Sequence, residues 1–224
     1  MLLLLKACLN GARTPEEHPA LPVTPEQLAD DAARVRAAGA QAVHLHVKDA
    51  QGADTLDGEL LAEVLAAVRR SAPGLAVGVT TGAWSAPDPV RRVSAVRAWT
   101  ALPDFASVNW HEPGAEQVAQ VLLELPDGLD ERGTAAQAEQ LLGLLSAGGN
   151  DVPVLLHGEG SSCWPALRHA AGRGLATRIG LEDVLTLPDG SPAPDNAALV
   201  SAAAALLAPS RPASDGAPGG DAES

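Results

Sequence analysis

The sequence predicts an α/β protein with a TIM-barrel-like (β/α)8 fold that lacks about one βα unit near its fifth strand. Short apolar segments of strand character alternate with amphipathic helical segments, which is typical of a parallel sheet buried on both faces. Only about seven such strands can be counted. Polar and acidic residues directly follow the strands, where β/α barrels place their functional side chains: Asn10, His46, Thr80, Thr81, Asn109, His157, Glu159, Glu182 and Asp183.

The first half of the chain supplies four predicted strands and three predicted helices. Residues 2–9 form an apolar run that predicts a buried first strand. Thr24 and Pro25 then mark a helix start, and Gln27 completes a capping box with the threonine. An apolar stripe follows at helical spacing, and Gly39 ends this helix. The later elements are strand 42–47, a turn at 49–52, helix 59–70, strand 75–81, helix 89–99 and strand 105–110.

The second half continues the alternation but is one unit short. The helical stretch at residues 116–120 runs almost directly into a strand predicted at residues 121–125, which leaves no room for a complete helix, a connection and a new strand. We therefore expect residues 118–131 to be the least regular part of the fold, with a gapped wall or one completed by a neighbouring subunit. The remaining elements are helix 134–146, strand 152–157, helix 164–173, strand 176–182 and helix 195–207.

The chain divides into one predicted domain and a tail. Residues 1–208 carry the alternating pattern, and a chain of 224 residues can bury a substantial core in a single domain. Residues 209–224 are rich in Pro, Gly, Ser, Ala and Asp and lack any apolar pattern, so we expect this tail to be disordered.

Charge and cysteine usage restrict the partners and the compartment. A net charge of −13 opposes nonspecific binding to nucleic acid or to an anionic membrane. Cys8 and Cys163 are too few for a disulfide framework and fit a reducing compartment. The apolar run in residues 1–6 is too short for a signal peptide or a membrane span. The expected location is therefore cytoplasmic, without nucleic-acid or membrane partners.

His44 and His46 are the most informative pair in the sequence. They are two residues apart on the strand at 42–47, so both imidazoles project from the same face. With one nearby carboxylate they would form a divalent-metal site with open positions, and Glu182 or Asp183 could supply it. Taken alone, the pair could instead be two hydrogen-bonded core histidines, although the metal site is favoured.

Four segments, in this order along the chain, resemble one family. They are Ala-Cys-Leu-Asn-Gly-Ala at 7–12, Val-His-Leu-His-Val-Lys-Asp at 43–49, Val-Thr-Thr-Gly at 79–82 and Arg-Ile-Gly-Leu-Glu-Asp at 178–183. Together they resemble the β-keto acid cleavage enzymes, whose type member is the 3-keto-5-aminohexanoate cleavage enzyme. The resemblance covers nearly the whole chain except the tail. It implies a zinc-dependent (β/α)8 barrel, commonly a homotetramer, that reacts a β-keto acid with acetyl-CoA to give acetoacetate and a new acyl-CoA.

The resemblance also implies roles for individual residues. His44, His46 and Glu182 would hold the zinc ion. Arg178 would hold the substrate carboxylate or polarise the reacting group, and Asp183 would be the base or part of a base relay. The candidate substrate-binding residues are Thr80, where the family often has a serine, together with Thr81, Asn10, Asn109 and Glu159. Thr80, Thr81 and Glu159 could instead form structural turns.

Two departures from the family pattern concern the base and the pocket. The type member has an acid where this chain has Arg13, so a carboxylate of the base relay is missing or is replaced by Glu16 or Glu17. The family's fifth strand carries a glutamate that helps to select the substrate, and this chain has no clear equivalent, since Glu131 lies in a turn-like context. We therefore expect a more open pocket with weak selectivity.

Two other functions remain open from the sequence. A zinc-dependent barrel hydrolase would use a metal-bound water to attack an amide or ester, but such sites usually need further histidines or a bridging lysine on later strands. Here only His111 and His157 follow later strands. The third possibility is a catalytically impaired barrel that keeps the metal site but has lost turnover with the missing unit.

Overall fold

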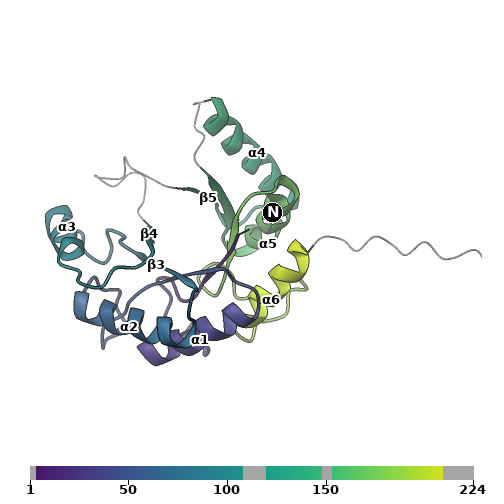
Figure 1. The fold of residues 1–224 in the computed structure, drawn as a ribbon. Helices are drawn as coiled ribbons and strands as arrows, with labels where there is room; N and C mark the ends of the chain where they lie inside the picture. Colours follow the sequence, from purple (N-terminus) through teal and green to yellow (C-terminus); the bar gives the residue numbers. More distant parts are fainter. Residues whose placement is uncertain (1–3, 108–119, 148–152, 209–224) are drawn as a thin grey trace, which may run out of the picture.

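The computed structural model describes residues 4–107, 120–147 and 153–208 (Figure 1). The described strands are β1 Leu5–Cys8, β2 Ala42–Leu45, β3 Ala76–Thr80, β4 Phe105–Ser107, β5 Val121–Leu125, β6 Val154–Gly158 and β7 Thr177–Ile179. The helices are α1 Pro25–Ala37, α2 Gly58–Ser71, α3 Pro89–Arg97, α4 Glu131–Ala147, α5 Cys163–Arg173 and α6 Asn196–Leu207, with a short 3-10 helix, η1 Gly160–Ser162. None of the described helices is long and apolar enough to cross a membrane.

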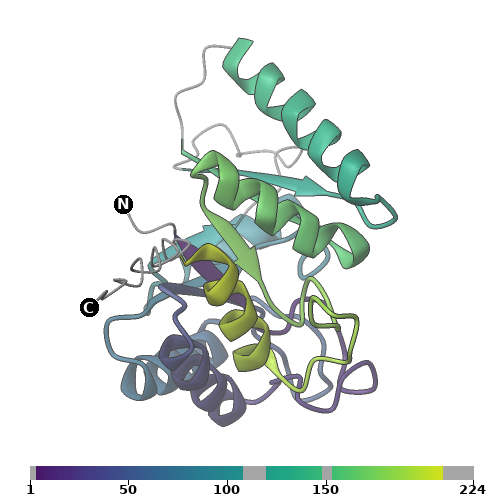
Figure 2. The same cartoon turned by 90° about the vertical axis from the view of Figure 1, so that its right-hand side faces the viewer.

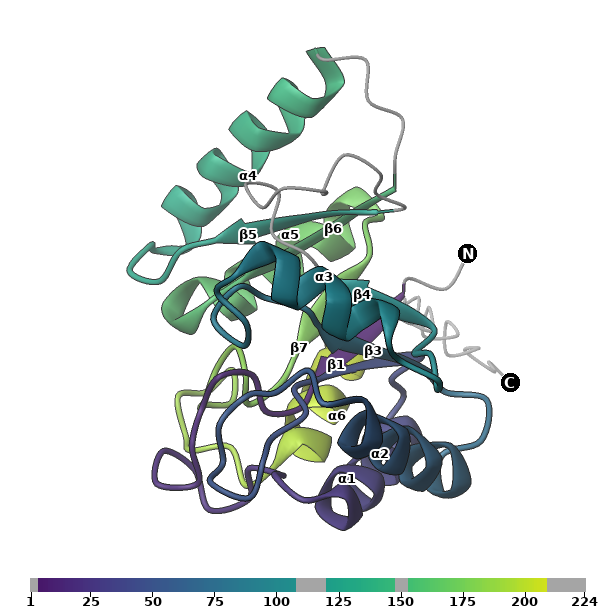
Figure 3. The ribbon, with the colours of Figure 1, turned by 90° about the vertical axis from the view of Figure 1, so that its left-hand side faces the viewer.

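The described strands form a parallel wall in which β4 and β5 do not pair with each other, and the side between these two strands is called the opening. Five strands pair in the order β4-β3-β2-β1-β7, and β5 pairs with β6 in a second sheet. A parallel bridge between Leu155 and Ala176 joins the sheets at the start of β7. There the Thr177 hydroxyl also donates to the Leu156 carbonyl at 2.8 Å. The order of the described strands is therefore β4-β3-β2-β1-β7-β6-β5, and Figure 1 shows α3 beyond β4 at one end of this order and α4 beyond β5 at the other, while Figure 3 shows the same strands from the side.

This architecture confirms the expected TIM-barrel-like α/β fold, and the described residues contain about one βα unit fewer than a complete barrel. Seven strands are present among the described residues, and the opening lies near the position of a fifth strand. The ends of two expected strands, at residues 2–3 and 108–110, lie outside the described residues, as does the expected disordered tail at 209–224.

The expected irregularity of residues 118–131 is wrong for the described part of that segment. Strand β5 pairs with β6 along its whole length, from Val121 opposite Val154 to Leu125 opposite Gly158. Helix α4 then begins at Glu131. The pairing with β6 makes β5 regular although its other edge faces the opening.

Helices α1, α2, α5 and α6 cover the outside of the wall and bury its aliphatic core. The main cluster joins β1, β2, β3 and β7 to these helices through side chains such as Leu5, Leu45, Val77, Ile179, Leu65, Leu167 and Leu199. A smaller cluster packs β5 and β6 against α4 and α5 through Leu125, Leu156, Ala138, Ala166 and Ala170. Figure 2 shows α4, α5 and α6 following one another along this side of the molecule.

The two helices that border the opening are the least buried. In α3, Val90 is 74% exposed and Val93 is 43% exposed. In α4, only Thr134 and Ala138 are buried, and Leu144 is 64% exposed. In a closed barrel each helix packs between two neighbours, so these exposed apolar side chains mark the side on which a neighbour is absent from the described chain.

Candidate metal centre and active site

His44, His46 and Glu182 converge at the carboxyl end of the strands. One ligand atom from each lies within 4.8 Å of the other two. His44 is on β2, His46 directly follows it, and Glu182 follows β7. Strand β1 lies between β2 and β7 and pairs with both, which brings the distant glutamate to the two histidines.

Two glycines make this approach possible. Gly11 has a φ of +56°, and a Cβ there would lie 2.5 Å from Cγ of Glu182. A Cβ at Gly180 would lie 1.8 Å from the carbonyl oxygen of Cys8. Only glycine combines the left-handed conformation at position 11 with so close a contact. The glycines thus let the loop after β7 pack directly on the end of β1.

The protonation states of His44 and Glu182 suit metal ligands. Burial lowers the pKa of His44 to about 3, against the attraction of Glu182, so its imidazole is neutral near pH 7. Burial opposes ionisation of Glu182, but the Arg178 guanidinium and the adjacent histidines hold the pKa of Glu182 below its usual value. Neutral imidazole and ionised carboxylate are the forms that bind a divalent cation.

Glu182 supplies a direct test of whether these residues fit a metal. Its Oε2 atom is buried and has no hydrogen-bond partner among the described residues. A buried carboxylate oxygen without a partner is costly unless something else satisfies it. Two imidazole nitrogens and this oxygen form a donor set that zinc commonly takes in catalytic sites. The residues present therefore fit the ion.

His46 is held by a second carboxylate. Its Nδ1 atom lies 2.7 Å from Oδ2 of Asp54, and the two rings of His44 and His46 meet edge to face at 5.4 Å between centroids. Burial would raise the pKa of Asp54, but hydrogen bonds from His46, Lys48 and Trp84 lower it to about 2. The sequence analysis missed Asp54, because only the folded loop places it beside His46.

Arg178 and Asp183 form a buried ion pair next to the proposed ligand Glu182. The guanidinium Nη2 lies 2.6 Å from Oδ1 of Asp183 and 3.3 Å from Oε1 of Glu182. Burial raises the pKa of Asp183 to about 7 despite the attraction of Arg178. Asp183 Oδ2 and Arg178 Nε are buried without a hydrogen-bond partner in the described parts of the chain. A donor and an acceptor are thus free to meet a substrate.

His157 and Glu124 extend this group toward the opening. Nδ1 of His157 lies 3.9 Å from Asp183 Oδ1, and its Nε2 lies 3.6 Å from Glu124 Oε2. Glu124 Oε2 is also 3.9 Å from Arg178 Nη2. The side chain of Glu124 is 52% exposed. Its partial burial and the negative charge of Glu159 raise the pKa of Glu124.

Sequence reasoning missed Glu124 as well as a buried lysine. Glu124 interrupts the apolar run Val-Leu-Leu-Glu-Leu of β5, and a lone acid in such a strand was the signal available. Lys6 on β1 is opposite Arg178 in register and lies 4.8 Å above the ring of Phe105. Burial lowers the pKa of Lys6. The interior of this barrel is therefore charged below the proposed metal centre.

Three of the candidate substrate-binding residues already form hydrogen bonds with neighbouring parts of the protein. The Asn10 amide is fully buried and bonds to the Pro22 carbonyl and to both backbone groups of His46. The Thr80 hydroxyl accepts from the Gly82 amide at 3.2 Å, and the Thr81 hydroxyl donates to the Ser107 carbonyl at 2.8 Å. These bonds shape the end of the strands, and substrate contact by these three residues stays a prediction.

The remaining candidates are Glu159, Asn109 and the acids near Arg13. Glu159 is exposed directly after β6, and Asn109 lies outside the described residues. Arg13 donates to the Glu182 carbonyl at 3.3 Å and pairs with the exposed Glu17 at 2.9 Å. Glu16 is exposed as well. Glu17 is therefore occupied by Arg13, which leaves Asp183 as the base candidate in contact with the site.

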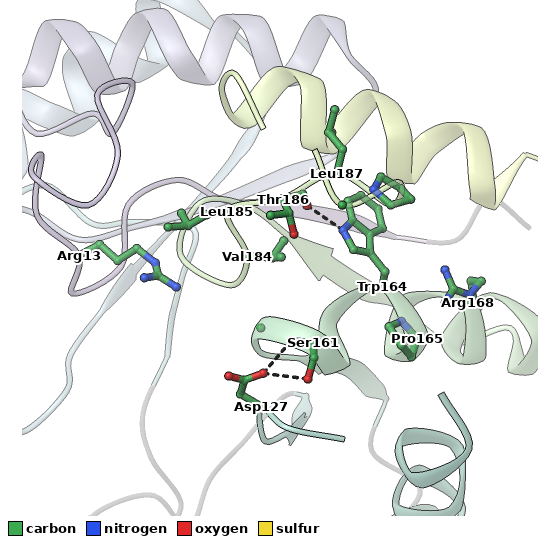
Figure 4. Close-up of a pocket in the computed structure, with 13 residues that line it drawn as sticks. Arg13, Asp127, Ser161, Trp164, Pro165, Arg168, Val184, Leu185, Thr186 and Leu187 are labelled. Carbon is green, nitrogen blue, oxygen red and sulfur yellow. Dashed lines mark hydrogen bonds between the residues drawn. The ribbon is translucent and has the colours of Figure 1, made fainter. Parts of the chain in front are cut away.

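A cavity of about 570 Å³ lies among the loops at the carboxyl end of the strands (Figure 4). The segments after β1, β5, β6 and β7 and the start of α5 line it, with Arg13, Asp127, Ser161, Leu185 and Trp164 among others. Its wall near β5 is held together by Asp127, which accepts hydrogen bonds from the amide and hydroxyl of Ser161. No proposed metal ligand lines this cavity, so it adjoins the chemical site without containing it.

The sequence profile of one family, described as beta-keto acid cleavage enzyme, matches residues 3–141 and 118–211. The chain belongs to this family. The two matched segments overlap at residues 118–141, close to the opening between β4 and β5. The match confirms the resemblance inferred from the four motifs.

Individual relatives support the same family and fold. Over 81 residues the chain is 36% identical to the 3-keto-5-aminohexanoate cleavage enzyme of Fusobacterium nucleatum, a stretch that covers 36% of this chain and 30% of that enzyme. The structure is similar to that of ObcA in ternary complex with a C4-CoA adduct and oxalate, with a TM-score of 0.61 and 17% sequence identity. This match covers 84% of this chain and 64% of ObcA. ObcA with oxaloacetate also gives a TM-score of 0.61, at 18% identity, and the match covers 82% of this chain and 62% of that chain. The chain thus spans less than two thirds of the length of these relatives.

Proposed function

We propose that this family member is a zinc-dependent transferase that condenses a β-keto acid with acetyl-CoA, giving acetoacetate and a new acyl-CoA. The observation that carries the proposal is the buried Arg178–Asp183 pair beside the unpartnered Oε2 of Glu182. One site thus contains a base with a raised pKa, Asp183, a fixed cation, Arg178, and a set of atoms that could bind a metal ion. Together these three elements suit proton abstraction next to a carbonyl, because the base takes the proton and the cation and metal stabilise the negative charge.

His44, His46 and Glu182 would hold the zinc ion through two nitrogens and one oxygen. When bound, zinc would supply Lewis acidity toward the ketone and carboxylate oxygens of a β-keto acid, which acidifies the carbon between them. The chain provides the rest of the chemistry. Arg178 offers its planar donor fork to negative charge on the substrate, and its side chain is only 8% exposed, so water competes weakly.

Asp183 carries the proton in the proposed sequence. Its carboxylate takes the proton from C2 of the keto acid, and C2 then forms a bond to the acetyl carbonyl carbon as the coenzyme A thiolate leaves. The thiolate attacks the former ketone carbon, C3, and the C2–C3 bond breaks with its electron pair staying on C2. Asp183 returns the proton to C2, which completes acetoacetate, while C3 leaves as the new acyl-CoA.

The opening between β4 and β5 favours a second candidate, a catalytically impaired barrel that keeps the metal site. Leu122 and Glu124 on β5 are 36% and 52% exposed, although strand residues of a closed barrel are enclosed. A site that admits water would hydrolyse or protonate reactive intermediates. If turnover survives, the same opening supports weak substrate selectivity. The cytoplasmic location and a homotetrameric assembly stay predictions.

Acetyl-CoA consumption separates these functions. We would assay the full chain, loaded with zinc, against a panel of β-keto acids, with and without a chelator. The proposal expects acetyl-CoA to be consumed and acetoacetate formed only with metal present. Metal binding without any turnover would support the impaired barrel, and metal-dependent hydrolysis of an amide or ester would support a hydrolase.

A further inference from the structure

A short loop fixes Asp54 against the proposed ligand His46. The chain leaves β2, turns back at Asp49 and forms an antiparallel bridge between Lys48 and Asp54. The Asp49 amide donates a hydrogen bond of 2.8 Å to the Ala53 carbonyl, which closes the turn. Gly52, with a φ of +80°, adopts the left-handed conformation that the turn requires. These bonds are local, so they place Asp54 without help from a metal.

Three nitrogen atoms, from His46, Trp84 and Lys48, surround the Asp54 carboxylate. Its Oδ2 lies 2.7 Å from Nδ1 of His46 and accepts from the Trp84 indole at 2.8 Å. Its Oδ1 accepts from the Lys48 ammonium, also at 2.8 Å. The side chain of Asp54 is 6% exposed and that of Lys48 is 2% exposed. An ionised carboxylate surrounded in this way can only accept hydrogen bonds.

Trp84 also fixes the plane of the His46 ring. The two rings stack with 5.9 Å between centroids and 21° between planes. His46 is therefore held along its edge by Asp54 and across its face by Trp84. A ring restrained in both ways loses little rotational freedom when it binds a ligand.

We infer that Asp54 is a positioning residue that holds His46 in the Nδ1–H tautomer and directs its Nε2 lone pair at His44 and Glu182. A neutral imidazole has one N–H and one lone pair, and Nδ1 must donate because Asp54 can only accept. The remaining lone pair is on Nε2, on the side away from Asp54. This inference rests on the metal centre of the proposed function and adds to it the residue that prepares one ligand before the ion arrives.

Carboxylate-to-amide variants in the same loop test this role. Asp54→Asn keeps the size of the side chain but removes the charge that requires Nδ1 to donate. Asp57→Asn is the matched control, because Asp57 caps α2 by accepting from the Glu59 and Leu60 amides and does not reach His46. We would titrate each full-length protein with zinc against a competing chelator. We would also record ¹⁵N-histidine NMR spectra of the metal-free proteins, with His46 assigned from a His46→Gln variant.

The expected results separate positioning from a structural role. Asp54→Asn should weaken zinc binding about 10- to 100-fold while Asp57→Asn binds as the wild type does. His46 should be the Nδ1–H tautomer in the metal-free wild type and a mixture in Asp54→Asn. Unchanged zinc affinity in a folded Asp54→Asn protein overturns the positioning role of Asp54 but not the metal centre. An Nε2–H tautomer of His46 in the wild type does the same, and this measurement needs no Asp54 variant. A wild-type chain that takes up no zinc overturns the metal centre itself.

Discussion

Arg178 and Asp183 lie 2.6 Å apart as a buried ion pair, and the guanidinium simultaneously contacts Glu182 at 3.3 Å. One cation is thus shared between a proposed base and a proposed metal ligand. The arrangement keeps Glu182 ionised while burial keeps the pKa of Asp183 near 7. Neighbouring carboxylates with pKa values shifted in opposite directions are suited to different tasks, here metal binding and proton transfer.

Replacing His46 should abolish tight zinc binding. In His46→Ala the site would keep only His44 and Glu182, and two ligands do not hold zinc at a three-ligand affinity. Elemental analysis of the purified variant should show well under one zinc per chain. His169→Ala is the control, because His169 pairs with Glu139 between α4 and α5. Stoichiometric zinc in His46→Ala at wild-type affinity would contradict the ligand assignment.

Replacing Asp183 should remove turnover and leave the fold intact. Asp183→Asn keeps an oxygen acceptor for Arg178 but cannot take a proton, so the rate should fall about 10²- to 10⁴-fold. Steady-state rates with a reactive β-keto acid and a thermal melt would check both parts. Asp189→Asn, a change in an exposed loop where Asp189 bonds to Ser191, should leave the rate unchanged. Equal rates for Asp183→Asn and wild type would exclude the base role.

Gly11→Ala should damage the metal site through the backbone. The new Cβ would meet Cγ of Glu182 at 2.5 Å, and a φ of +56° is strained for alanine, at a cost of about 1–3 kcal/mol. We expect weaker zinc binding and a lower melting temperature. Gly143→Ala in α4, where a Cβ meets nothing within 4 Å, should instead stabilise the helix by about 0.5–1 kcal/mol. Full zinc affinity in Gly11→Ala would show that Glu182 does not need this close packing.

Asp31 should make stability fall as the pH rises through the acidic range. Burial raises the pKa of Asp31 to about 6 from 3.8, despite hydrogen bonds from Asn196 and Arg34. The folded state therefore holds a proton that the unfolded state releases, so the contribution of Asp31 is present below pH 4 and is lost by about pH 6. The change is about 3 kcal/mol, from about two pKa units.

Denaturant unfolding of wild type and Asp31→Asn at several pH values would measure this term. Asparagine does not titrate, so the stability of the variant relative to wild type should rise between pH 4 and pH 6 and then level off. A difference that does not change with pH would show that Asp31 ionises at the same pH in both states.

Local features of the fold were readable in the sequence because their causes are local. The predicted capping box of α1 is present, with the Thr24 side chain and the Gln27 side chain each accepting from the other's backbone amide. The predicted turn at residues 49–52 is closed by Asp49 and Gly52. Both depend on side-chain chemistry within a few residues, which does not change with the rest of the chain.

The candidate site was only partly readable. His44 and His46 share a face because strand residues alternate with a period of two. That Glu182 or Asp183 could join them was expected from the residues, the choice of Glu182 came only from the resemblance to the family, and Asp54 and Glu124 were missed. Their contacts depend on a loop that folds back on β2 and on a strand beside the opening.

By itself, the sequence determined the alternation of strands and helices, the helix caps and the same-face histidine pair, because apolar periodicity and capping act over one or two turns of chain. Only the tertiary structure decided that β7 pairs with β1, which carries Glu182 to the histidines, and that β4 and β5 stay apart among the described strands. The physical reason is that strand pairing joins residues far apart in sequence. It is chosen by the packing of the whole wall and by glycines that allow close backbone contact, and no single segment encodes that choice.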